Sequence, residues 1–167
     1  AGDAIGWQVK HDYPIVMNSM RGKWTPQLSS KQVGLVAEGQ TWTNRSILAE
    51  FLKTRQANPK AVIIDTSQWP VYDVGGWWVT LSGELYDDAD QANAWCDAQG
   101  YDSDHCLAKR IESNGTSQGT TKLRRRLGRA DCSCRCAYRR ASGLQALLQV
   151  QHPRGRLVHP RREGRIG

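Results

Sequence analysis

The chain lacks any long apolar run. No stretch approaches the roughly 20 residues that a helix needs to cross a bilayer, and no N-terminal signal peptide is visible. Because the sequence starts at Ala1 rather than at Met, any signal or membrane anchor would belong to a part of the protein outside it. We therefore expect no membrane-spanning segment within these 167 residues.

Signatures of catalysis and of metal binding are also missing. The chain has no G-x-S-x-G motif, "LSSK" is not S-x-x-K, and no glycine-rich loop opens a helix as a phosphate cradle would. "DDAD" and "DSD" lack the loop length and distal Glu of an EF-hand, and "CSCRC" is too tight for the usual paired zinc ligands. His11 and His105 show no spacing that indicates a catalytic triad. We expect no catalytic residues, no metal and no cofactor.

Aromatic and acidic residues are scarce in the last third of the chain. All seven tryptophans lie at or before Trp95, and Tyr138 is the only Phe, Tyr or Trp after residue 114. Residues 1–113 carry ten Lys and Arg against fourteen Asp and Glu, whereas the remainder carries thirteen against two, so the net charge of +7 combines an acidic and a basic part. We expect a globular domain over 1–112, a polar linker "SNGTSQGTT" over 113–121 and a poorly ordered basic tail over 122–167.

Hydrophobic spacing predicts two helices. In "NRSILAEFLKTRQANP" the apolar residues fall at i, i+1, i+4 and i+5, Asn44 suits the N-cap, and Pro59 ends the helix. "DDADQANAWCDAQG" has its apolar residues on one face, an aspartate at its start and Gly100 where a left-handed C-cap belongs.

Short apolar runs predict strands. The runs are "VGLVA" (33–37), "AVIID" (61–65), "WWVTLSG" (77–83) and "HCLAKRI" (105–111), and "AIGWQV" (4–9) reads as a further edge strand. Prolines and a glycine interrupt residues 10–32, which we interpret as mostly loop. The order β-α-β-β-α-β predicts an α+β fold of ferredoxin-like type, a small sheet with two helices on one face and the other face open.

The adjacent Trp77 and Trp78 cannot both enter one core if they lie on a strand, because neighbouring side chains point to opposite faces. We expect one indole beneath the helices and the other on the open face or under the loop of residues 10–32. Either the loop covers the second ring, or the ring is a stacking platform for a sugar or a peptide. In the second case Trp42 and Trp69, from neighbouring loops, would complete the ligand-binding surface.

Cys96 and Cys106 lie at the end of the second helix and in the strand that follows. The short connection "DAQGYDSDH" can bring them within disulfide reach, which would indicate an oxidising compartment. The alternative is two separate buried thiols.

The basic tail has three interpretations. A binding arm would neutralise the phosphates of a nucleic acid or another acidic polymer, weakly and without sequence preference, through Arg124, Arg125, Arg126, Arg139 and Arg140. The Arg, Gly, Ala and Cys content is also what out-of-frame reading of GC-rich DNA tends to give. The apolar stretch "GLQALLQV" (143–150) favours a folded extension.

Two blocks carry a resemblance to a known family. They are "WTPQLSSKQVGLVAEGQTWTNRSILAEFLKTRQANP" (24–59) and "GGWWVTLSGELYDDADQANAWCDAQGYDSDHCLAKRI" (75–111). Together they resemble a small extracytoplasmic domain of actinobacterial envelope proteins, which can follow the transmembrane helix of serine/threonine kinases. The layout is also similar to that of SPOR-like domains, which bind peptidoglycan glycan strands.

This resemblance implies a non-catalytic binding or sensor module outside the cytoplasm, secreted or anchored through a segment that this sequence does not contain. Its partner would be cell-wall glycan or another envelope protein. The resemblance supplies no catalytic residues, and the tail from Asn114 has no counterpart in it.

Overall fold

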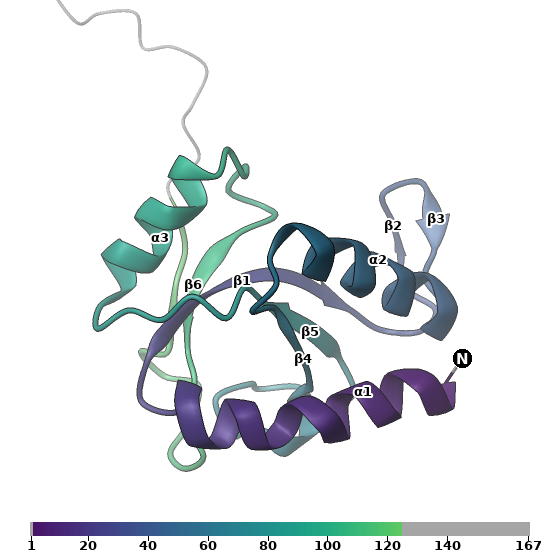
Figure 1. The fold of residues 1–167 in the computed structure, drawn as a ribbon, viewed down its shortest axis with the longest axis horizontal. Coiled ribbons are helices and arrows are strands. Elements are labelled where there is room, and N and C mark those ends of the chain that lie inside the picture. The colour runs from purple at the N-terminus through teal and green to yellow at the C-terminus, as the bar shows by residue number, and fades with distance from the viewer. Residues whose placement is uncertain (1, 125–167) are drawn as a thin grey trace, which may run out of the picture. The chain divides into compact units, whose positions relative to one another are not determined.

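A computed structural model describes residues 2–124 (Figure 1). The helical elements are α1 (Gly2–Ile15), the π-helical turn η1 (Val16–Met20), α2 (Asn44–Ala57), the 3-10 turn η2 (Thr66–Gln68) and α3 (Ala89–Ala98). The strands are β1 (Trp24–Lys31), β2 (Val36–Ala37), β3 (Gln40–Thr41), β4 (Val62–Asp65), β5 (Trp78–Leu81), β6 (Leu107–Arg110) and β7 (Thr121–Lys122).

Five strands form one sheet in the order β4-β5-β1-β6-β7, and every neighbouring pair is antiparallel. The connection through α2 joins β1 to β4, and the connection through α3 joins β5 to β6. Both helices lie on one face of the sheet, where Ile63 packs against α2 and Ala108 against α3 (Figure 1). The predicted α+β fold with two helices on one face is confirmed.

The two predicted helices begin at well-formed caps. Thr43, rather than the expected Asn44, caps α2 through a reciprocal pair of hydrogen bonds with Ser46. Asp88 caps α3 by accepting a hydrogen bond from the backbone N–H of Gln91. The buried side of α2 is carried by Ile47 and Phe51.

The N-terminal segment is helical, so the prediction of an edge strand over 4–9 and of a loop from residue 10 is wrong. Its buried positions include Ile5, Val9, Asp12, Val16 and Met20, which recur at the spacing of one helix face. This stretch runs beside β4, the edge strand of the sheet, and contributes to the core on both sides of it. Asp12 accepts a hydrogen bond from the backbone N–H of Ile63 in β4, with its Oδ2 at 3.0 Å. The edge strand is therefore covered by a helix and bonded to it.

The first strand of the sheet also differs from the expectation. It is β1, within the segment predicted to be loop, whereas residues 36–37 of the predicted strand only pair with β3 in a small separate hairpin. β1 lies between β5 and β6, and its pairing with β5 shifts between Gln27 and Ser29, as at a β-bulge.

The face turned away from α2 and α3 is not open over most of its area. Trp69 and Val71, in the connection between η2 and β5, pack there against Val79 and Leu81 of β5. Val16 and Met20 of η1 extend this cluster. The remaining accessible part lies toward Gln27 of β1 and Leu107 of β6.

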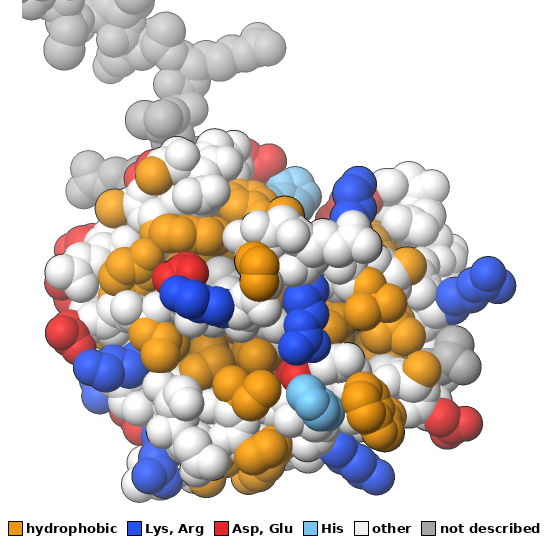
Figure 2. All heavy atoms as spheres, viewed as in Figure 1, with side chains coloured by type: hydrophobic (Ala, Val, Ile, Leu, Met, Phe, Trp, Pro, Cys, Tyr) orange, Lys and Arg blue, Asp and Glu red, His pale blue; other side chains and the backbone are white. Residues whose placement is uncertain are grey.

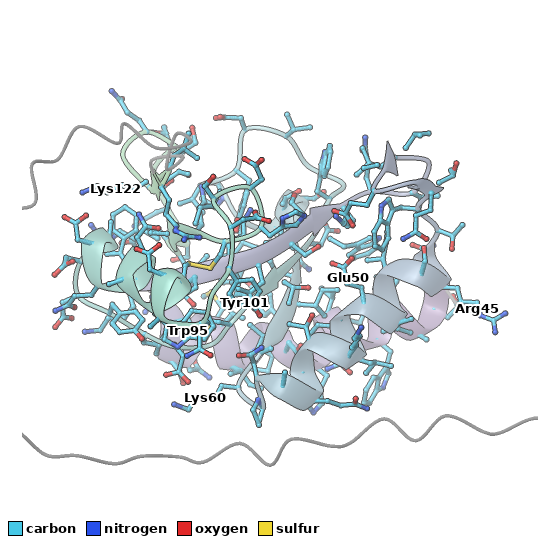
Figure 3. All side chains as sticks on the ribbon, turned by 90° about the horizontal axis from the view of Figure 1, so that it is seen from above. Arg45, Glu50, Lys60, Trp95, Tyr101 and Lys122 are labelled. Carbon is cyan, nitrogen blue, oxygen red and sulfur yellow. A yellow bond between two sulfur atoms is a disulfide. The ribbon has the colours of Figure 1, made fainter. Side chains whose placement is uncertain are left out.

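Cys96 and Cys106 form a disulfide with their Cα atoms 5.8 Å apart, as predicted. Both are buried and pack against Leu28 of β1. Beside the bridge, Trp95 and Tyr101 stack with their ring centroids 6.0 Å apart (Figure 3). The bridge thus joins the end of α3 to the start of β6.

Residues 113–121, predicted to be a linker, belong to the fold. The chain turns back after β6, and Thr120 is buried where its carbonyl accepts a hydrogen bond from the N–H of Arg110. β7 then pairs with β6, and Asn93 of α3 donates to the carbonyl of Lys122. The domain therefore extends beyond the expected boundary at residue 112.

Candidate functional site

Two adjoining depressions lie on the sheet face opposite α2 and α3. Their volumes are about 260 and 350 Å³, and Tyr72 and Asp73 line both of them. The smaller is also lined by Ser30, Val74 and Trp77, and the larger by Gln27, Lys109 and Ser117. We call these two depressions together the sheet-face groove.

The Trp77 ring is placed in the groove by a turn that fixes the chain before β5. The backbone N–H of Trp77 donates to Thr66 Oγ1 at 3.1 Å, and its carbonyl accepts from the Thr66 N–H at 3.0 Å. Gly75 allows this turn, because a Cβ there would lie 2.7 Å from Ser67 Oγ. The half-buried Trp77 is thus held at the backbone while its side chain lines the groove.

The buried Lys109 side chain holds several segments together at the base of the groove. Its Nζ donates to the carbonyl of Val71 and to the hydroxyl groups of Thr120 and Thr121, and lies 4.4 Å from the centre of the Tyr72 ring. Tyr72 in turn donates its hydroxyl to Gln27 Oε1 at 3.1 Å, and burial raises its pKa. These contacts tie β1, β6, β7 and the η2–β5 connection together.

Burial lowers the pKa of Lys109 from 10.5 to about 8, and nearby Asp73 opposes this shift. We expect ¹³Cε NMR to show one lysine titrating near pH 8. In the unfolded chain Lys109 keeps its proton up to about pH 10.5, whereas in the folded chain it loses the proton near pH 8. Between these two pH values the contribution of Lys109 to the free energy of unfolding should therefore grow as the pH rises. A spectrum in which no lysine titrates below about pH 9.5 would contradict this assignment.

The four tryptophans predicted to bind a ligand do not form one surface. Trp42 and Trp69 are only 4% and 2% exposed, so neither presents a ring face to solvent. Trp78 packs beside α2 and donates its indole N–H to Asn44, as expected for a ring beneath the helices. Of these four, only Trp77 lines the groove, at the end of the η2–β5 connection rather than under residues 10–32.

His105 belongs to a different depression, which lies between the β2–β3 hairpin and the disulfide loop, the segment that joins Cys96 to Cys106. Its Nδ1 lies 2.7 Å from Asp102 Oδ1, and its Nε2 lies 3.6 Å from Glu38 Oε1, which also pairs with Lys31. The Asp102 hydrogen bond raises the pKa of His105, and the same contact lowers that of Asp102. The side-chain hydrogen bond from Lys31 lowers the pKa of Glu38. These ion pairs join the turn between β2 and β3 to the loop between Cys96 and Cys106.

His11 lies elsewhere, on α1. Its ring stacks on exposed Trp7, and its Nδ1 lies 3.1 Å from Asp12 Oδ1. Across residues 2–124, no group of three or more His, Cys, Asp or Glu side chains is arranged to hold a metal ion. No helix in that range is long and apolar enough to cross a membrane.

Arg124, predicted to contact nucleic acid, uses its guanidinium group for contacts within the domain. Its guanidinium pairs with Asp97 and donates to the carbonyls of Tyr101, Asp102 and Cys106. The other predicted contacts, Arg125, Arg126, Arg139 and Arg140, lie outside the described residues. On the face shown in Figure 2, Lys and Arg side chains alternate with acidic and hydrophobic ones and form no continuous basic surface.

Sequence reasoning missed Tyr72, Asp73, Gln27 and Lys109 as groove residues. One signal was available, since the connection "TSQWPVYDVGG" carries bulky apolar side chains that a solvent-exposed loop would not need. Such a segment is expected to fold back on the core, as Trp69 and Val71 do.

Comparisons with known proteins give no further guide, because no family model, no curated protein and no solved structure matches this chain.

Proposed function

We propose that this domain is a non-catalytic binding or sensor module that works outside the cytoplasm. Its ligand is a cell-wall glycan or, as the second candidate, another envelope protein, and the sheet-face groove is the binding site. The observation that supports this most directly is the Trp77 ring, which lines a depression beside hydrogen-bonding side chains.

The groove chemistry fits a sugar better than a purely apolar ligand. Trp77 offers a flat apolar ring, against which the C–H face of a pyranose can stack. Ser30 and Asp73 line the same depression as Trp77, and Gln27 and Ser117 line the adjoining one. Carboxylate, amide and hydroxyl groups can exchange hydrogen bonds with sugar hydroxyls. An aromatic ring with polar groups around it is the usual composition of a small-ligand site.

The disulfide supports the proposed location. Disulfides form and persist in oxidising compartments and are rare in reducing ones. Cys96 and Cys106 are both buried, at 0% and 1% exposure, so their bridge reinforces the core below α3. A domain stabilised in this way suits the space outside the cytoplasm.

The test is a change of Trp77 to alanine. Ring stacking of this kind contributes about 0.5–1.5 kcal/mol, so Trp77→Ala should weaken binding to purified cell-wall glycan by about two- to ten-fold. Co-sedimentation with insoluble sacculi and calorimetry with soluble glycan fragments would measure this change. Urea denaturation should show that the variant stays folded, because the ring is only half buried.

Trp7→Ala is the matched control. It removes an indole that is 63% exposed on α1 and lines neither depression, and it should leave glycan binding unchanged. The proposal would be wrong if the wild-type protein bound no cell-wall fraction, or if both variants bound as tightly as the wild type. Retention of an envelope protein in place of glycan, lost with Trp77→Ala, would select the second candidate.

A further inference from the structure

Within residues 2–124, two charged side chains line the groove, Asp73 and Lys109. They differ in whether they can still bind a ligand. Lys109 is 4% exposed, and its Nζ already donates to three acceptors, in Val71, Thr120 and Thr121. An ammonium group has three N–H donors. Lys109 therefore has no donor left for a ligand, and its charge faces the Tyr72 ring inside the fold.

Asp73 is exposed and lines both depressions, so it stands where they meet. Its Oδ1 accepts a hydrogen bond from the Ser117 hydroxyl, which orients the carboxylate. In the described part of the chain, Oδ2 accepts no hydrogen bond. Among the residues that the structure describes, the groove thus offers a ligand one oriented carboxylate and no available cation.

We propose that the sheet-face groove prefers a glycan that carries free amino groups, as in a glucosamine polymer without its N-acetyl groups. A sugar ammonium would pair with Asp73 while a sugar ring of the same chain stacks on Trp77. This inference rests on the proposed function and adds to it the charge of the ligand. A fully N-acetylated chain would gain only the stacking contact, and a chain with carboxylate or phosphate groups would be repelled by Asp73.

The test compares two soluble oligosaccharides of equal length on the full chain. They are a fully N-acetylated glucosamine hexamer, which is neutral, and the deacetylated hexamer, whose amino groups are protonated at about pH 6. The variant is Asp73→Asn, which keeps an oxygen for Ser117 and removes the charge. Exposed ion pairs are weak, so Asp73→Asn should lower the affinity for the amino hexamer by about two- to five-fold. Its affinity for the acetylated hexamer should not change.

Asp3→Asn is the control for net charge, because Asp3 is exposed in the first turn of α1 and lines neither depression. It should change neither affinity. Added salt should remove the Asp73 effect, since exposed charges are screened.

The outcomes separate this inference from the proposed function. If Asp73→Asn changes both hexamers equally, or neither, the preference for amino groups is wrong, while Trp77-dependent binding would still support a glycan site. If neither hexamer binds in a Trp77-dependent way, the preference for amino groups and the assignment of a glycan to this groove are both wrong. If a lysine-rich peptide binds through Asp73 and Trp77 and the hexamers do not, the ligand is a protein and the inference is overturned.

Discussion

A chain that ends at Glu112 should be far less stable than a chain that ends at Arg124. The shorter chain loses β7 and the buried Thr120. It also removes two of the three hydrogen-bond acceptors of Lys109 and the acceptor of the Arg110 N–H. At about 1 kcal/mol for each lost hydrogen bond, the total cost is about 3 kcal/mol or more. A loss of this size would lower Tm by roughly 10 °C.

Thermal and urea denaturation of the two truncated chains, beside the full-length protein, would measure this difference. The chain that ends at Arg124 keeps the pairing with Asp97 and the bonds to the disulfide loop. It should therefore unfold at a clearly higher midpoint than the chain that ends at Glu112. Equal midpoints for the two truncated chains would show that residues 113–124 contribute nothing to the fold.

Replacement of Asp12 by alanine should also destabilise the domain strongly. The side chain is fully buried, and its carboxylate accepts hydrogen bonds from the N–H of Ile63 and from Gln8 Nε2, at 3.0 and 2.8 Å. Arg55 Nη1 lies 3.7 Å from the same group. Alanine would leave the Ile63 N–H of the edge strand buried without an acceptor, which together with the lost charge pairing costs about 3 kcal/mol.

Asp12→Asn is the informative companion variant, because its amide oxygen can still accept from Ile63 while the charge near Arg55 is lost. Urea denaturation should rank the stabilities as wild type, then Asn, then Ala. A loss below about 0.5 kcal/mol for Asp12→Ala, the size expected of an ordinary surface substitution, would contradict the structural role of this contact.

The sequence was sufficient for the parts of the fold that follow simple local rules. The apolar stripe on residues 44–57 and the capped segment after Asp88 became α2 and α3, and the spacing of Cys96 and Cys106 predicted their bridge. In each case, residues close together in the sequence decide the structure.

Prediction from the sequence failed for the elements that carry polar residues at buried positions. In α1 the buried face includes Asp12, so the apolar repeat appeared too weak for a helix, and Pro14 added a false stop. In β1 the sequence "WTPQLSSK" has few apolar residues and a proline, which usually argues against a central strand. Tertiary contacts override these signals, because the helix covers a strand edge and β1 is paired on both sides.

Of the groove residues named above, Trp77 is the one that the sequence indicated. Its position before a strand and next to Trp78 required the two rings to separate, and they do. Asp73 and Lys109 come together with it only through the sheet order and the return of residues 113–122, which sequence spacing alone does not reveal. The exposure of Trp42 and Trp69 was misjudged because both lie in connections that fold back onto the core.

The bulge in β1 interrupts the alternation by which every second residue of a strand faces the same side of the sheet. Up to and including the bulge, the even positions Trp24 and Leu28 pack on the side of α3, whereas after it an odd position, Lys31, lies against Trp42 on the same face of the sheet. A comparison that assumes unbroken two-residue alternation would assign the second half of the strand to the wrong side. Deleting one residue between Gln27 and Ser29 would restore regular parity and exchange the inner and outer surfaces of the strand before the bulge, which would turn polar Gln27 toward the helices.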